Sequence, residues 1–199
     1  MIIKEEIGPA VINVKAIRMT KIECEAEECL LCDLRNNRTN LVFSRGTYNT
    51  ELAIIGESPG YHEDQQGIPF CGPSGELLNN MIKAMGYKPN NVYITNVCKC
   101  RPPNNRKPTP DEIEKCKPFL VRQLDIVRPK VIVTLGATAM EALLGFGLGI
   151  TKRRGIWVEY NNIKVMPTFH PAACLRNHDL KHDVWKDLQE VIKVLNDRE

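Results

Sequence analysis

The cysteines are the residues whose number and spacing most directly indicate chemistry in this sequence. The chain has eight of them in 199 residues. A disulfide framework is typical of short secreted chains, so metal binding by some of the eight is the better explanation. Cys29 and Cys32 are separated by two residues, which lets both sulfurs reach one metal centre, and Cys100 and Cys116 follow far along the chain. Spacing alone leaves three possibilities open, namely a four-thiolate zinc site, a 4Fe–4S cluster and no metal.

Basic residues form a second group that could take part in binding. Lys99, Arg101, Arg106 and Lys107 fall within nine residues that contain no acid. Such runs are most often solvated surface, although they also bind phosphates. The net charge of the chain is only +3, so the overall charge neither demands nor excludes a nucleic-acid partner.

The elements that must position these residues are predicted by the apolar pattern. Strands are predicted at 51–56, 92–97 and 130–135, and a hairpin is predicted to pair 157–160 with 163–166. Helices are predicted at 74–85, 110–127, 137–144 and 182–195, with a short helix and turn at 21–35. Thr109 as a cap and Pro110 in the first turn give helix 110–127 a clear beginning.

This alternation predicts an α/β fold, a three-layer α/β/α sandwich with a central, mostly parallel sheet. We expect residues 1–20 to be an N-terminal extension with strand-like pieces and residues 21–199 to form a single domain. Ligands of such sheets bind outside the carboxyl ends of the strands. Function is therefore expected in the segments that follow strands, at 56–60, 96–106, 136–138 and 168–176.

Four motifs resemble those of the family-four uracil-DNA glycosylases. They are GESPG at 56–60, GIPFCGPSGELL at 67–78, YITNVCKCRPPNNR at 93–106 and TFHPAACLR at 168–176. The family patterns are GEAPG, G-x-PF-x-G-x-x-G-x-LL, ITNV-x-KCRPP-x-NR and HPAA-x-LR, and they occur in the same order. The resemblance implies a uracil-DNA glycosylase-like domain that hydrolyses the N-glycosidic bond of flipped-out deoxyuridine in DNA, as a monofunctional enzyme that leaves an abasic site.

The resemblance also implies a cofactor. The family carries a 4Fe–4S cluster on four cysteines, and the matching positions here are Cys29, Cys32, Cys100 and Cys116. The remaining cysteines, Cys24, Cys71, Cys98 and Cys174, are then expected not to bind it. Cys98 is a competitor for this assignment, because it lies two residues from Cys100 on one extended segment.

The resemblance assigns five residues to the uracil. Gly56 and Ser58 match the loop beside the base, and Phe70 matches the ring that stacks on it. Asn96 matches the residue that reads the uracil edge, where its amide oxygen accepts from N3–H and its NH₂ donates to O4. His170 matches a donor to O2, where negative charge gathers as the glycosidic bond breaks.

The resemblance also assigns residues to the attacking water and to DNA. Glu63, Asn105 and Glu57 match positions that orient or activate the attacking water, next to Ser58, which replaces the alanine usual in the motif. Leu175 resembles a wedge that fills the gap left by the flipped base. The candidate phosphate contacts are Arg101, Arg106, Lys107 and Arg176.

Other readings of the sequence remain open. One is a superfamily member with a shifted base specificity, and another is a non-catalytic iron–sulfur nucleic-acid-binding protein that keeps the fold. The presence of Phe70, Asn96 and His170 together argues against the second. A relative that bonds covalently to uracil through a Lys-Arg-Arg-Ile-His loop is disfavoured, because Gly155 and Ile156 follow Arg154 in place of Ile-His and no histidine occurs in 104–110.

The surroundings of the protein are predicted from composition. No apolar run approaches the roughly 20 residues of a membrane span, and the first residues are acidic where a secretory signal would be basic. We therefore expect a cytoplasmic monomer with no membrane partner. Its expected partners are uracil-containing DNA, single- and double-stranded, and uracil as product.

Overall fold

A six-stranded sheet forms the centre of the protein, whose computed structural model describes residues 13–145, 147 and 149–197. The strands are β1 (Ser44–Arg45), β2 (Leu52–Gly56), β3 (Tyr93–Asn96), β4 (Val131–Leu135), β5 (Val158–Tyr160) and β6 (Ile163–Thr168). Their order is β1-β3-β2-β4-β6-β5. The four inner strands are parallel, and β1 and β5 pair antiparallel at the two edges.

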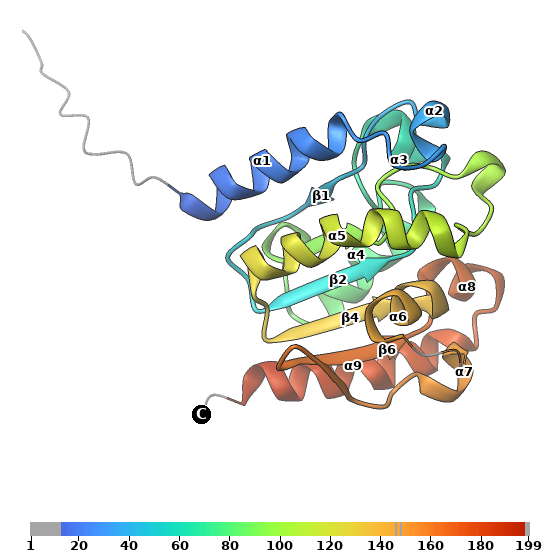
Figure 1. Cartoon of the computed structure of the whole chain (residues 1–199). Helices are drawn as coiled ribbons and strands as arrows, with labels where there is room; N and C mark the ends of the chain where they lie inside the picture. Colours follow the sequence, from blue (N-terminus) through green and yellow to red (C-terminus); the bar gives the residue numbers. More distant parts are fainter. Residues whose placement is uncertain (1–12, 146, 148, 198–199) are drawn as a thin grey trace, which may run out of the picture.

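Helices cover both faces of this sheet and complete three layers (Figure 1). One face carries α1 (Val14–Glu27), α5 (Pro110–Val127) and α6 (Gly136–Leu144), and the other carries α4 (Pro73–Ala84), α8 (Pro171–Arg176) and α9 (Leu180–Asn196). The shorter helices are α2 (Leu34–Asn37), α3 (Tyr61–Gln66) and α7 (Ile150–Arg153). The predicted α/β sandwich with a mostly parallel sheet is confirmed.

The core is divided by the sheet into two apolar clusters. Because successive side chains of a strand point to opposite faces, Tyr93 packs with α1 and α5, whereas Ile94 packs with α4 and α9. The central strands β2 and β4 are buried throughout, as expected of strands covered on both faces.

The N-terminal part of the chain differs from the prediction. Strand-like pieces were expected up to residue 20, but a helix begins at Val14 and runs through that boundary. Met19, Ile22 and Ala26 recur at helical spacing and are buried against the core under α5. The β-branched residues of this segment favour strands, yet packing of one helical face decides the structure. The rest of the predicted extension, residues 1–12, lies outside the described residues.

Several short elements were not predicted from the sequence, namely β1, α3, α7 and α8. Each is six residues long or shorter, so each offers too few periods for a pattern to be recognised. Among the helices in the described residues, none has both the length and the apolar character needed to cross a membrane.

Candidate active site

A cavity of about 620 Å³ opens at the carboxyl ends of the parallel strands. Residues at or just after the ends of β2, β3, β4 and β6 contribute to it, as expected for a sheet of this type. Eight of the residues predicted for the site line it together: Glu57, Ser58, Glu63, Phe70, Asn96, Asn105, His170 and Arg176. Of the other candidates, Gly56 lies beneath the lining, and Arg101, Arg106, Lys107 and Leu175 lie outside it.

Phe70 is held in an uncommon conformation beside this cavity. Its φ angle is 55°, a left-handed value that costs free energy for a residue with a bulky side chain. Two glycines make room for it, because a Cβ on Gly75 would lie 1.7 Å from the Phe70 carbonyl oxygen and a Cβ on Gly56 would lie 2.5 Å from its ring. The buried ring is thus positioned by backbone on both sides.

Asn96 ends β3 with its side chain in the cavity. It is 2% exposed, and its Oδ1 atom is buried without a hydrogen-bond partner in the described residues. An orphaned buried acceptor is costly, so its presence at a cavity wall points to a ligand with a donor. The absence of a side chain on Gly56 leaves space at this oxygen, because a Cβ there would come within 2.3 Å of it.

His170 caps the N-terminus of α8 with its side chain. Its Nδ1 accepts a hydrogen bond from the backbone N–H of Ala172 at 3.1 Å, so the proton of the neutral ring is on Nε2. Burial, together with the smaller effect of the positive charge of Arg176, lowers the pKa of His170 to about 4. The imidazole is therefore neutral at physiological pH, and it stacks against Phe70 with ring centroids 5.7 Å apart.

Three further polar side chains line the cavity, and hydrogen bonds hold two of them, Glu57 and Asn105. The Glu57 carboxylate accepts a hydrogen bond from Thr138 of α6 at 2.5 Å. The Asn105 amide oxygen accepts from Arg101 Nε at 2.7 Å, which leaves the amide NH₂ of Asn105 as the available donor. Glu63 lies in the first turn of α3 and, like Glu57, presents a carboxylate to the cavity.

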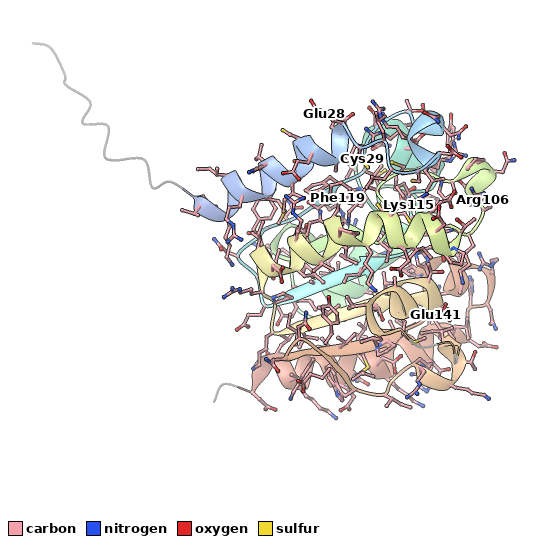
Figure 2. All side chains as sticks on the ribbon, in the orientation of Figure 1. Glu28, Cys29, Arg106, Lys115, Phe119 and Glu141 are labelled. Atoms are coloured by element: carbon pink, nitrogen blue, oxygen red, sulfur yellow. The ribbon has the colours of Figure 1, made fainter. Side chains whose placement is uncertain are left out.

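The candidate DNA contacts fall into two groups by their partners. Arg106 forms a two-pronged ion pair with Glu112, and Lys107 lies 3.7 Å from Glu141 of α6; Figure 2 labels Arg106 and Glu141. No carboxylate pairs with Arg101 or Arg176 among the described residues. Leu175, on α8, is 41% exposed.

Lys99 belongs to the basic run of the sequence but not to the surface. It is 1% exposed, and its Nζ donates to the Asn96 carbonyl oxygen at 2.5 Å and to Thr95 Oγ1 at 2.7 Å. Burial lowers the pKa of Lys99 to about 8, against the opposing effect of the thiol of Cys116. Its backbone N–H donates to Cys116 Sγ at 3.3 Å, so one residue contacts both the end of β3 and a cysteine.

The four cysteines of the predicted ligand set line a second, smaller cavity between the end of α1 and α5. Figure 2 shows Cys29 close to Lys115 and Phe119 of α5, which line the same cavity. Among the described residues, no group of three or more His, Cys, Asp or Glu side chains is arranged to hold a metal ion. Cys98 is fully buried and does not line the cavity. The Cys100 sulfur accepts from Arg38 at 3.3 Å.

Among the cavity-lining residues that were not predicted from the sequence, two carry aromatic rings. Tyr61 and His62 follow GESPG at the beginning of α3 and both line the cavity. The signal available was their position directly after a motif that follows a strand. Their place at the rim of the cavity depends on α3, which is too short to be predicted from the sequence.

Comparison with known proteins places the chain in a family. Residues 43–189 match the Uracil DNA glycosylase superfamily. A type-4 uracil-DNA glycosylase of Thermotoga maritima is 44% identical over 168 residues, covering 82% of this chain and 88% of the relative. Those of Sulfurisphaera tokodaii and Archaeoglobus fulgidus are 43% and 42% identical, covering 87% and 84% of this chain and 83% and 88% of the relatives. The chain therefore belongs to the type-4 uracil-DNA glycosylases of the Uracil DNA glycosylase superfamily.

Proposed function

We propose that this enzyme hydrolyses the N-glycosidic bond of flipped-out deoxyuridine in DNA, releasing uracil and leaving an abasic site for base excision repair. The observation that carries the proposal is the unpartnered Oδ1 of Asn96, buried in the wall of a cavity that Phe70 and His170 also line. A base cannot be attacked inside the helical stack, so such an enzyme needs a cavity that accepts a base turned out of the stack. The names of the relatives support the same activity.

Recognition of uracil is assigned to Asn96 and Phe70. The Oδ1 atom would accept from uracil N3–H, and the NH₂ of the same amide would donate to O4. Cytosine presents an acceptor at N3 and a donor at the neighbouring position, so a fixed amide would face two mismatches. The aromatic ring of Phe70 would stack on the base, an interaction worth about 1–3 kcal/mol.

Cleavage is assigned to His170. Since Nδ1 is occupied by the Ala172 N–H, the Nε2–H of the neutral ring is the group available to donate to uracil O2. Negative charge develops on the base as the C–N bond breaks, and a donor aimed at O2 stabilises that charge. A neutral donor avoids protonating the leaving base before the bond has broken.

The attacking water is assigned to Glu57, Glu63 and Asn105, with Ser58 in the adjoining loop. The carboxylates can accept a hydrogen bond from water, and the free NH₂ of Asn105 can donate one to it. A sugar with oxocarbenium character needs orientation of this water more than strong base catalysis. The hydrogen bonds from Thr138 to Glu57 and from Arg101 to Asn105 support a fixed geometry for these two groups.

Contact with DNA is assigned to the cations around the cavity and to Leu175. Arg176 lines the cavity itself, and Arg101 adjoins it through Asn105. The exposed side chain of Leu175 would enter the stack in place of the flipped nucleotide. Arg106 and Lys107 would bind phosphate only in competition with their carboxylate partners.

A 4Fe–4S cluster is assigned to Cys29, Cys32, Cys100 and Cys116. Support comes from the four sulfurs lining one cavity and from the N–H donors to Cys116 and Cys100, since such hydrogen bonds stabilise cluster thiolates. When bound, the cluster would join the chain near residue 30 to both ends of the segment 100–116. That segment carries Arg101 and Asn105, so the role assigned to the cluster is to order it.

The activity is tested with single- and double-stranded oligonucleotides that contain one uracil, followed by alkaline cleavage at the abasic site. Strand cleavage at uracil, without cleavage of inosine or thymine-mismatch controls, is expected. Release of another base instead would indicate a shifted specificity, and binding without release would indicate a non-catalytic protein. Borohydride should trap no enzyme–DNA adduct, because a hydrolytic mechanism forms no Schiff base.

The cluster is tested on the purified protein without reference to activity. A brown colour with visible absorption and about four irons per chain are expected. Cys100→Ser should lower the iron content, whereas Cys24→Ser, at an exposed cysteine outside the cavity, should not. Colourless protein with one stoichiometric zinc would contradict the assignment.

A further inference from the structure

The rim of the cavity holds an exposed aromatic residue that the proposed chemistry does not use. Tyr61 begins α3, lines the cavity and is 52% exposed. Its ring is nevertheless braced, because His62 meets it edge-on at 5.6 Å. His62 is in turn packed against Gly72, where a Cβ would come within 3.1 Å of the imidazole. An ordered, half-exposed ring at a cavity mouth is a surface on which a planar group can stack.

Arg101 lies against the same ring. Its guanidinium carbon is 5.1 Å from the ring centroid of Tyr61, within the range of a cation–π contact. Its Nε is fixed by the Asn105 oxygen at 2.7 Å. Arg101 has no carboxylate partner in the described part of the chain, unlike Arg106 and Lys107. The aromatic ring and the amide therefore hold a positive charge in place without neutralising it.

Together these two side chains match the two parts of a nucleotide. An aromatic face binds a nucleobase of any sequence, and an oriented guanidinium binds a phosphate. Both adjoin the cavity, since Tyr61 lines it directly and Arg101 holds the lining residue Asn105. A nucleotide bound there would be a neighbour of the one inside the cavity on the same strand.

We propose that Tyr61 and Arg101 form a subsite for the nucleotide next to the flipped deoxyuridine, with its base stacked on Tyr61 and its phosphate on Arg101. The subsite rests on the proposed function, because it presumes that the cavity takes the uracil. It would stabilise an unstacked neighbour whether or not a complementary strand is present. It would also be indifferent to the identity of that neighbouring base, because every base has a π-face.

The test removes the ring and the neighbouring base separately and together. Binding is measured on single-stranded oligonucleotides that carry a non-hydrolysable deoxyuridine analogue, with the 5′ or the 3′ neighbour either present or replaced by an abasic spacer. The variants are Tyr61→Ala, Tyr61→Leu, which keeps bulk without aromaticity, and Tyr61→Phe, which keeps the ring. Thermal unfolding of each variant establishes that it is folded.

With all bases present, Tyr61→Ala and Tyr61→Leu are expected to weaken binding about 5- to 150-fold, the range of one lost base–aromatic stack. Tyr61→Phe should bind like the wild type. Removal of the neighbouring base on one side should weaken wild-type binding by a similar factor and leave Tyr61→Ala unaffected. Arg101→Ala should reduce the slope of log affinity against log salt by about 0.7 on single strands.

A Tyr61→Ala variant that binds like the wild type would overturn the subsite. So would additive losses of affinity, in which removal of either neighbouring base, 5′ or 3′, weakens binding of Tyr61→Ala as much as it weakens binding of the wild type. That result is distinct from failure of the proposed function. The wild type is assayed in parallel for uracil release from ordinary uracil-containing DNA. Release by the wild type together with an inert Tyr61 refutes the subsite alone, whereas no release refutes the proposed function.

Discussion

Burial gives His170 an imidazole that stays neutral well into the acid range, and one hydrogen bond decides which nitrogen carries its proton. Protonation of Nδ1 would convert the acceptor of the Ala172 N–H into a donor and remove the cap of α8. The tautomer and the local helix are therefore coupled. The sequence indicated that a histidine belongs here but could not indicate its protonation, which depends on burial and on the positions of Arg176 and Ala172.

The His170 ring is expected to titrate near pH 4 rather than near 6.5. Since its pKa is lowered in the folded state, the unfolded chain binds more protons between these values. Stability from this residue should be complete above about pH 6.5 and decline as the pH falls toward 4. Imidazole NMR resonances of the free enzyme, assigned by their loss in His170→Gln, measure the midpoint. A midpoint of 6 or above would contradict this prediction.

His170→Ala should lower the single-turnover rate of uracil release and spare the affinity for DNA. The interaction with O2 strengthens only as charge develops, so the loss should fall on the transition state. The expected decrease is about 10²–10³-fold, typical of one donor to a developing oxyanion. Single-turnover kinetics at saturating enzyme measure it, and an unchanged rate would show that the role is assigned to the wrong residue.

Asn96→Asp should weaken the preference for uracil over cytosine. A protonated carboxyl can donate to cytosine N3 and accept from its amino group, whereas the amide of Asn96 favours uracil. The rate on uracil should fall as well, because the carboxyl lacks the NH₂ that donates to O4. Single-turnover rates on uracil- and cytosine-containing strands measure both changes. Full rate and unchanged selectivity on uracil would contradict the assignment.

The long helices and strands were predictable because each contains enough residues, several helical turns or a full run of apolar strand residues, to show its apolar pattern. Helix α5 has the predicted bounds, and its capping box joins Thr109 to Glu112. The strands that end at the cavity were also expected, so the edge of the sheet that carries the site followed from the sequence. The short helix α3 was not predictable, and the two rim residues it presents were missed with it. The left-handed backbone of Phe70 likewise depends on packing against Gly75 that no local pattern records.

Gly75→Ala should damage the cavity through the contact between α4 and the Phe70 loop. An added Cβ would lie 1.7 Å from the Phe70 carbonyl oxygen, so the backbone that sets the ring must move. We expect a loss of about 1–3 kcal/mol in the free energy of unfolding and weaker binding of uracil-containing DNA. Thermal unfolding and binding measurements check the two effects.

Gly147→Ala is the matched control for this change, because a Cβ there meets nothing within 4 Å. The control should leave uracil affinity unchanged. Equal affinities and equal unfolding temperatures for Gly75→Ala and the wild type would mean that the Phe70 loop tolerates displacement. Stacking of Phe70 on the base would then not depend on the close contact between Gly75 and the Phe70 backbone.

Across the whole molecule, the availability of a charged side chain for binding depends on its partners more than on its position in the sequence. The run from Lys99 to Lys107 looked like a single basic surface, but Lys99 is buried and Arg106 is held by Glu112. That pairing holds the pKa of Glu112 at about 2, so the carboxylate remains charged at any working pH. Side-chain partners of this kind cannot be deduced from a run of like charges.

DNA binding should therefore depend on salt mainly through Arg101 and Arg176. Each neutralised phosphate contributes about 0.9 to the slope of log affinity against log salt on duplex DNA. Arg101→Ala and Arg176→Ala should each reduce the slope by about that amount, and Arg106→Ala should reduce it less. Titrations at several salt concentrations measure the slopes. Equal reductions for all three variants would show that DNA displaces Glu112 from Arg106.

The position of Lys99 has a consequence for how such enzymes diverge. The cysteine cavity packs against the cluster under α1 and α5, whereas Phe70 belongs to the cluster on the other side of the sheet, so the two halves can accumulate changes separately. Lys99 lines the cysteine cavity and donates from Nζ to the carbonyl oxygen of Asn96, and its buried ammonium has thiols rather than carboxylates as its nearby acidic groups. A lineage that abandons the four cysteines would retain an uncompensated charge in its interior. Descendants without the cysteines are expected to have exchanged this lysine for a neutral residue, an association that sequence surveys of natural relatives can measure.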